Sequence, residues 1–136
     1  FLHSVKGVLR GLHYQEEPMA QAKLVTVLRG VIYDVVVDVR PGSPTRGRWL
    51  SQTLTAEPRK MMWIPEGFAH GFCVVSETAD VLYKVSNYYS PEHERRIRWN
   101  DRSLAITWAL DGAPLLSEQD ADAPDFAAVA RAGTGA

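Results

Sequence analysis

A ten-residue segment of alternating residues constrains the fold of this chain more than any other feature. Between Val31 and Arg40, five apolar residues occupy every second position, and Asp34 and Asp38 lie between them. Successive side chains of a strand point to opposite faces, so a period of two predicts a β-strand with one buried side. The valines are expected on that side and the aspartates on the other.

Seven further segments have strand character, being short and rich in Val, Ile, Trp and Tyr. Turn residues such as Pro-Gly at 41–42 and Pro-Glu-Gly at 65–67 separate them. Short, regular spacing and the lack of a helical stripe before residue 117 predict an all-β sandwich or barrel. We expect helix only between residues 117 and 130. The seven segments are 22–29, 48–54, 61–64, 71–75, 79–86, 95–99 and 105–110.

Length and charge limit the classes of function. A chain of 136 residues is about one domain, which we expect to span residues 1–136. The net charge of −1 gives no electrostatic reason to expect nucleic acid or an anionic membrane as a partner. Cys73 is the only cysteine, which excludes an intrachain disulfide and fits a reducing compartment. No apolar run reaches the roughly 18 residues of a spanning helix, and we expect a cytoplasmic protein.

Two polar residues fall on strand faces that should point inward. Lys23 shares a face with Val25 and Val27, and Tyr83 shares one with Val81. An inward ammonium could oppose a developing negative charge, but a lysine at a strand end can also extend to water. An inward tyrosine often satisfies only a single hydrogen bond. Both interpretations stay open on the residues alone.

The histidines differ in their surroundings. His13 ends an extended run between glycines, and His70 follows a turn and precedes an apolar strand, whereas His3 and His93 stand beside polar residues and are expected in solvent. A purely structural role is an equal alternative for His70. Metal binding is disfavoured, because no two histidines are separated by one residue and no His/Glu cluster completes a site.

Seven sequence blocks together carry a family resemblance. The chain resembles the dTDP-4-dehydrorhamnose 3,5-epimerase family over nearly its whole length, with the blocks in that family's order. The resemblance implies a metal-independent cupin, a jelly-roll barrel of antiparallel strands that forms a homodimer and needs no cofactor. The blocks are GVLRGLHYQ (7–15), QAK (21–23), GVIYDVVVDVR (30–40), GSPT (42–45), IPEGFAHGF (64–72), YYSP (88–91) and LSEQD (116–120).

The resemblance also implies a reaction and roles for four residues. The substrate is a dTDP-4-keto-6-deoxyhexose, whose C3 and C5 protons are acidified by the C4 ketone, and the product serves dTDP-L-rhamnose or related deoxysugar biosynthesis. His13 would be the base, since an imidazole with a pKa of about 6.5 is usable at neutral pH. Asp120 would orient it, Tyr83 would return a proton to the opposite face, and Lys23 would stabilise the enolate oxygen.

Five further positions match substrate-binding positions of the family. Arg10 suits a diphosphate because a guanidinium donates two parallel hydrogen bonds. Tyr89 would stack on the thymine ring, although packing at a strand end is the alternative. His70 and Glu94 match other substrate contacts. Gln119 stands where many relatives carry lysine, which should weaken phosphate binding or change the sugar preference.

Other functions remain open at this level. The family's N-terminal segment, which supplies an arginine and an acid to the site and crosses to the partner subunit, is expected to be missing here. A ketoisomerase acting on the same nucleotide sugar and a non-catalytic cupin that only binds sugar nucleotides are the alternatives. Inversion of C3, C5 or both is not distinguished by the residues.

Overall fold

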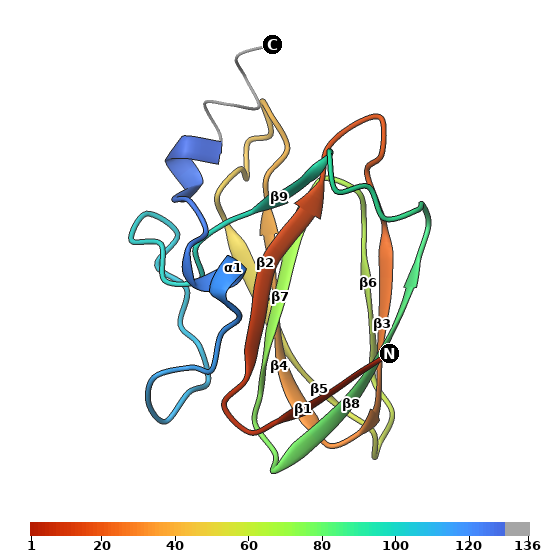
Figure 1. The fold of residues 1–136 in the computed structure, drawn as a ribbon. Coiled ribbons are helices and arrows are strands. Elements are labelled where there is room, and N and C mark those ends of the chain that lie inside the picture. The colour runs from red at the N-terminus through yellow and green to blue at the C-terminus, as the bar shows by residue number, and fades with distance from the viewer. Residues whose placement is uncertain (130–136) are drawn as a thin grey trace.

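Two antiparallel sheets face each other and enclose the hydrophobic core (Figure 1). The computed structural model describes residues 1–129. The four-stranded sheet has the order β1-β8-β3-β6, and the five-stranded sheet has the order β5-β4-β7-β2-β9. The bounds are β1 Leu2–Val5, β2 Leu9–Gln15, β3 Lys23–Arg29, β4 Val31–Asp38, β5 Trp49–Thr55, β6 Met61–Ile64, β7 Phe68–Val74, β8 Thr78–Val85, β9 Glu94–Arg96 and α1 Glu118–Ala121. The predicted all-β jelly-roll class is confirmed.

The inner faces of the two sheets build the main core. Val25 and Val27 of β3 meet Phe72 of β7 and Ile32 of β4 there, and all four side chains are fully buried. Burial of such side chains stabilises the fold by roughly 1.5–3 kcal/mol each. The same inner faces also carry polar groups, which places those groups in an apolar environment.

The alternating strand β4 is buried on both sides, which corrects the expectation of one buried side. Val35 and Val37 pack outside the five-stranded sheet, under the C-terminal segment, in a second cluster with Leu104. The opposite face points into the barrel and carries Asp34, which has no exposed surface. The predicted alternation is therefore confirmed, but the face with Val35 and Val37 lies outside the barrel, and the face with Asp34 lines its interior.

The expectation of a strand over residues 105–110 is wrong. The segment lacks strand pairing, and Ala105 has a positive φ of 52°. Side chains hold its middle instead, since Tyr33 donates to the Thr107 carbonyl at 2.8 Å and Trp108 donates to the Trp99 carbonyl at 2.9 Å. Its aromatic and aliphatic residues cover the outer cluster, so their apolar character reflects burial without a strand partner.

Helix is confined to the C-terminal region, as predicted. Ser117 caps α1 by accepting a hydrogen bond from the Asp120 amide at 3.1 Å. A second helical turn covers residues 126–129. Residue 130, the end of the predicted helical region, lies outside the described residues. Over residues 1–129, the structure contains no helix long and apolar enough to cross a membrane.

Candidate active site

An irregularity in β2 turns two predicted site residues to the same face. Arg10 is paired with Phe72 and His13 with His70, and the register shifts between these pairs. In a regular strand, residues three apart point to opposite faces. Gly11 adopts a φ of +130°, which favours glycine, and a Cβ there would lie 2.6 Å from the Gly71 Cα. The glycine thus allows Arg10 and His13 both to face the barrel interior.

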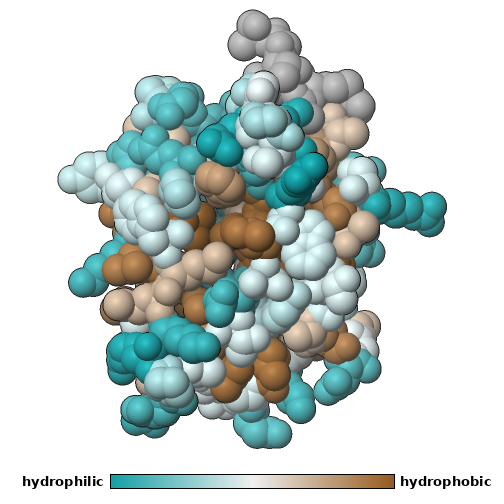
Figure 2. All heavy atoms as spheres, turned by 180° about the vertical axis from the view of Figure 1, so that it is seen from behind, coloured by the Kyte–Doolittle hydropathy of each residue, from teal (hydrophilic) through white to brown (hydrophobic). Residues whose placement is uncertain are grey.

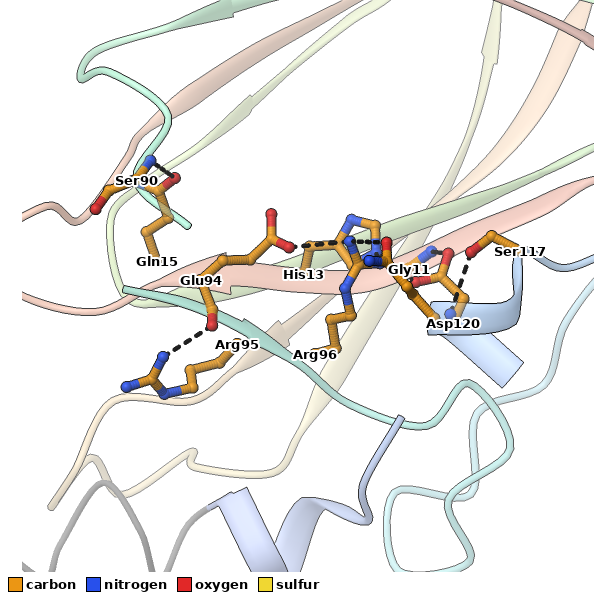
Figure 3. A network of polar contacts seen from close by, with 10 residues as sticks. Gly11, His13, Gln15, Ser90, Glu94, Arg95, Arg96, Ser117 and Asp120 are labelled. Carbon is orange, nitrogen blue, oxygen red and sulfur yellow. Dashed lines mark hydrogen bonds and ion pairs between the residues drawn. The ribbon is translucent and has the colours of Figure 1, made fainter. Parts of the chain in front are cut away.

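The predicted base and its partner are in contact. His13 Nε2 lies 2.6 Å from Asp120 Oδ1, and the Gly11 amide donates to Asp120 Oδ2 at 3.1 Å (Figure 3). Burial alone would raise the pKa of Asp120, but hydrogen bonds from His13, the Gly11 amide and Arg96 outweigh it and lower this pKa below its ordinary value. Asp120 is therefore a carboxylate that can orient the His13 ring.

Arg96 joins this pair to two predicted binding residues. Its Nη1 contacts Asp120 Oδ1 and lies 2.7 Å from His13 Nε2. Its Nη2 lies 2.9 Å from Glu94 Oε1 and donates to Gln119 Oε1 at 3.1 Å. Glu94 and Gln119 are thus placed beside the predicted base, and Arg96 is the cation that they share.

A second histidine–aspartate pair lies deeper in the barrel. His70 of β7 is directly opposite His13 in the register, so the two imidazoles project from the same face. His70 Nε2 lies 2.5 Å from Asp34 Oδ1, and both side chains are buried. Asp34 Oδ2 has no hydrogen-bond partner among the described residues. A buried acceptor left unpaired is costly, so Asp34 lowers the stability of this interior.

The four-stranded sheet contributes the predicted acid and cation from the other side. The Tyr83 ring stands edge-on to His70 at 5.7 Å between centroids, and Lys23 Nζ lies 5.9 Å from the centre of the Tyr83 ring. Burial, followed by the nearby Asp34, raises the pKa of Tyr83 well above its ordinary value. Burial also lowers the pKa of Lys23, although Glu94 and Asp34 oppose this. His13 and Tyr83 are therefore both neighbours of His70 in one interior.

The remaining predicted residues lie at the edges of this interior. Arg10 donates through Nε and Nη2 to the buried Ser4 Oγ at 3.2 and 3.0 Å, which ties the two sheets together. Tyr89 is 64% exposed in the segment between β8 and β9. Its ring is free to stack on a ligand. The structure thus brings the other predicted residues together and leaves Tyr89 on the surface nearby.

Two residues of this site, Asp34 and Arg96, were not predicted from the sequence. Asp34 was placed opposite the buried valines, yet its neighbours at two-residue spacing, Ile32 and Val36, are apolar and signalled a second buried face. Arg96 carried no comparable signal, because the direction of its side chain depends on pairing with β2.

No group suited to a metal ion accompanies these residues. Among residues 1–129, no three His, Cys, Asp or Glu side chains are grouped closely enough to hold one. A pocket of about 430 Å³ lies elsewhere, beyond the outer face of β2, and is lined by Tyr14, Arg40 and Arg46. It contains none of the predicted site residues. The chemistry available at the site is acid–base and electrostatic.

Comparisons with known proteins agree with this arrangement. A curated dTDP-4-dehydrorhamnose 3,5-epimerase from Pseudomonas aeruginosa is 56% identical over 124 residues, which cover 91% of this chain and 68% of the relative. The RmlC epimerase of Legionella pneumophila, solved with dTDP-4-keto-L-rhamnose, is 50% identical with a TM-score of 0.87 and covers 93% of this chain and 66% of its own. ChmJ of Streptomyces bikiniensis, a 3'-monoepimerase solved with dTDP-quinovose, is 40% identical with a TM-score of 0.89 and covers 97% and 67%.

The match to the family extends over almost all described residues. The chain spans about two thirds of the length of these relatives. The sequence profile described as dTDP-4-dehydrorhamnose 3,5-epimerase matches residues 1–128. The chain therefore belongs to the dTDP-4-dehydrorhamnose 3,5-epimerase family of isomerases, as its sequence predicted.

Proposed function

We propose that this protein inverts C3, C5 or both in a dTDP-linked 4-keto-6-deoxyhexose of deoxysugar biosynthesis. The observation that carries the proposal is the arrangement of polar groups on facing sheets. His13, which contacts Asp120 of α1, projects from the five-stranded sheet, and Tyr83 and Lys23 project from the four-stranded sheet. Inversion of a carbon needs a base on one face of the sugar ring and an acid on the other. Relatives with dTDP-sugars bound support this substrate class.

The reaction follows from these positions. His13 takes the proton from C3 or C5. The electron pair of the broken C–H bond forms a double bond to C4, and the π electrons of the C4 ketone move to its oxygen. Lys23 stabilises the resulting enolate oxygen; a preorganised donor of this kind contributes about 3–4 kcal/mol. Tyr83 then delivers its hydroxyl proton to the opposite face, and solvent restores both residues. The substrate and product are isomers, so no redox step occurs.

The raised pKa of Tyr83 fits the role of an acid. A phenol that holds its proton firmly stays neutral at physiological pH and is ready to protonate a strongly basic carbanion. Burial lowers the pKa of Lys23, and the same burial strengthens the interaction of an ammonium with an enolate. Both residues are thus suited to charge that develops during the reaction.

The binding residues divide between the sugar and the nucleotide. We assign His70, which is held by Asp34, and the nearby Arg10 to the sugar and diphosphate. Glu94 and Gln119 lie beside His13 and complete this end of the site. The exposed Tyr89 stacks on the thymine base. The proposed setting is the cytoplasm, which the single buried Cys73 favours.

The proposed homodimer uses the outer face of the four-stranded sheet. Met61 and Trp63 of β6 are 57% and 60% exposed, and Trp63 is paired with Leu24 of β3 on that face. Figure 2 shows the molecule from behind, where hydrophobic residues reach the surface between polar ones. Large apolar side chains exposed together on β6 mark an interaction surface.

The direct test is proton exchange with solvent. The full-length protein is incubated with dTDP-4-keto-6-deoxyglucose in heavy water, and deuterium is followed at C3 and C5 by NMR. Incorporation at both carbons is expected for a 3,5-epimerase, and incorporation at one carbon for a mono-epimerase. His13→Asn is the control and should abolish exchange while the protein stays folded. Absence of exchange with the unmodified protein refutes catalysis and leaves the binding-only cupin.

A further inference from the structure

The guanidinium of Arg96 is the centre of the polar network around His13 (Figure 3). It contacts four side chains from three elements: His13 of β2, Glu94 of its own strand β9, and Gln119 and Asp120 of α1. Only 23% of the Arg96 side chain is exposed, and that of Asp120 only 4%. Burial of this kind makes a charge-assisted contact stronger than one on the open surface.

The contacts of Arg96 decide which nitrogen of His13 can act. His13 Nε2 lies 2.6 Å from Asp120 Oδ1 and 2.7 Å from Arg96 Nη1. The Asp120 carboxylate only accepts, so a neutral imidazole that keeps its hydrogen bond to Asp120 carries its proton on Nε2. Nε2 then has no lone pair for a second donor, so Arg96 Nη1 donates to Asp120 Oδ1 and acts on the ring through its charge. Within residues 1–129, Nδ1 makes no protein hydrogen bond, and it is left as the basic nitrogen.

We propose that Arg96 is a positioning residue for proton abstraction. It fixes the Asp120 carboxylate that accepts the Nε2 proton of His13, its charge favours the neutral imidazole, and Nδ1 is left as the atom that removes the substrate proton. This inference rests on the proposed epimerase function and deepens it. Glu94 and Gln119 also act on His13 through Arg96, because both contact Nη2 of its guanidinium.

The charges around His13 set the sign of the expected effect. Asp120 on α1 favours an imidazolium, whereas the Arg96 cation on β9 opposes it. The neighbour of His13 on β7 is His70, whose Nε2 contacts Asp34. The other nearby carboxylate, Glu94, is paired with Arg96 itself. Without the Arg96 charge, nothing opposes the attraction of Asp120 for an imidazolium. His13 then binds a second ring proton more readily, so the neutral form that acts as the base is lost at a higher pH.

The test compares Arg96→Gln with Arg96→Lys in the full-length protein. For Arg96→Gln we expect the acid limb of the kcat/KM profile to move to higher pH, because the cation that opposes an imidazolium is lost. We also expect kcat to fall about tenfold at the pH optimum, with KM nearly unchanged. Arg96→Lys keeps the charge and should restore the acid limb toward the wild-type position, although not the two-sided hydrogen bonding.

Arg95→Gln is a matched control for the loss of one positive charge. Arg95 is the neighbour of Arg96 on β9 but is paired with Tyr14 and contacts Glu16, on the other side of the strand. Its replacement should leave the acid limb and kcat unchanged. A shift equal to that of Arg96→Gln would show a general charge effect and overturn the positioning role.

An NMR titration of His13 separates this inference from the proposed function. Imidazole 15N shifts, assigned with His13→Gln, should show Nε2 protonated in the wild type, and the titration midpoint should be higher in Arg96→Gln than in the wild type. This readout needs no turnover. An unchanged midpoint and tautomer overturn the inference even where exchange proceeds, whereas a shifted midpoint without any exchange overturns only the epimerase proposal. A raised KM with an unchanged acid limb would instead make Arg96 a substrate ligand.

Discussion

At the scale of single residues, the barrel interior contains groups that a stable core would avoid. Lys23, Asp34, His70 and Tyr83 lie among apolar side chains, and only some of their polar atoms are paired. Unpaired polar groups in such surroundings cost stability. The proposed reaction gives these groups a purpose, because the same low polarity strengthens their interaction with charge on the substrate.

Lys23 allows this conflict between stability and activity to be measured. Burial lowers its pKa from the ordinary value of 10.5, so below that value the unfolded state binds the proton more tightly and the ammonium destabilises the fold. Lys23→Met should therefore raise the free energy of unfolding at pH 7 by about 1 kcal/mol, and lower kcat/KM by about a hundredfold or more. The stability gain should shrink as the pH approaches 10. Urea unfolding at the two pH values checks this.

Lys84→Met is the control for Lys23. Lys84 is exposed on β8, beside β3, and points away from the interior. Its replacement should change stability by no more than about 0.5 kcal/mol. An equal gain in both variants would show that burial of the ammonium is not the cause.

Prediction from sequence worked for residues whose direction follows from strand alternation. Lys23 and Tyr83 were placed inward because they alternate with buried valines, and they do face the interior. Asp34 was misplaced because alternation cannot tell which of two buried faces lines the barrel. Contacts between distant segments, such as Arg96 with His13, depend on pairing and register that no local pattern specifies.

At the scale of elements, the irregularity in β2 determines the geometry of the site. It sets Arg10 and His13 on one face and exposes the Gly11 amide to Asp120. The sequence showed that this segment is extended, but its shift in register arises only on pairing with β7. Residues 105–110 also show that a local pattern does not specify pairing. Their apolar residues resemble those of a strand, but the segment covers the outer cluster and is not a strand.

Replacement of Gly11 tests the importance of this irregularity. Gly11→Ala adds a Cβ 2.6 Å from the Gly71 Cα at a φ of +130°, so β2 must shift or separate from β7. We expect a loss of about 3 kcal/mol in the free energy of unfolding. Denaturant unfolding provides the measurement. Gly112→Ala, where a Cβ would meet nothing within 4 Å, is the control and should be nearly neutral. Equal, small effects in both would contradict the proposed constraint.

At the scale of the whole molecule, the two sheets differ in what covers them. The C-terminal segment packs on the outer side of the five-stranded sheet, whereas β6 of the four-stranded sheet exposes Met61 and Trp63. This asymmetry could not be predicted from the sequence, because it depends on which face the C-terminal residues cover. It is the basis for the proposed homodimer.

Trp63→Asp tests the proposed dimer surface. A buried, unpaired carboxylate in the interface should weaken association by several kcal/mol and convert the dimer to monomers at micromolar concentration. Light scattering after size-exclusion chromatography measures the mass. Leu50→Asp, at a side chain 68% exposed on β5, is the control and should leave the dimer intact. Dissociation by Leu50→Asp alone would move the interface to the other sheet.

In the proposed reaction, His13 and Tyr83 act on one sugar ring from opposite faces. This arrangement is tested by comparing deuterium uptake with inversion in Tyr83→Phe, by NMR of the dTDP-sugar in heavy water. If Tyr83 is the opposite-face acid, the variant should still exchange protons through His13 while inversion falls at least a hundredfold. Equal loss of exchange and inversion would contradict the account, since Tyr83 would then be needed for proton removal as well.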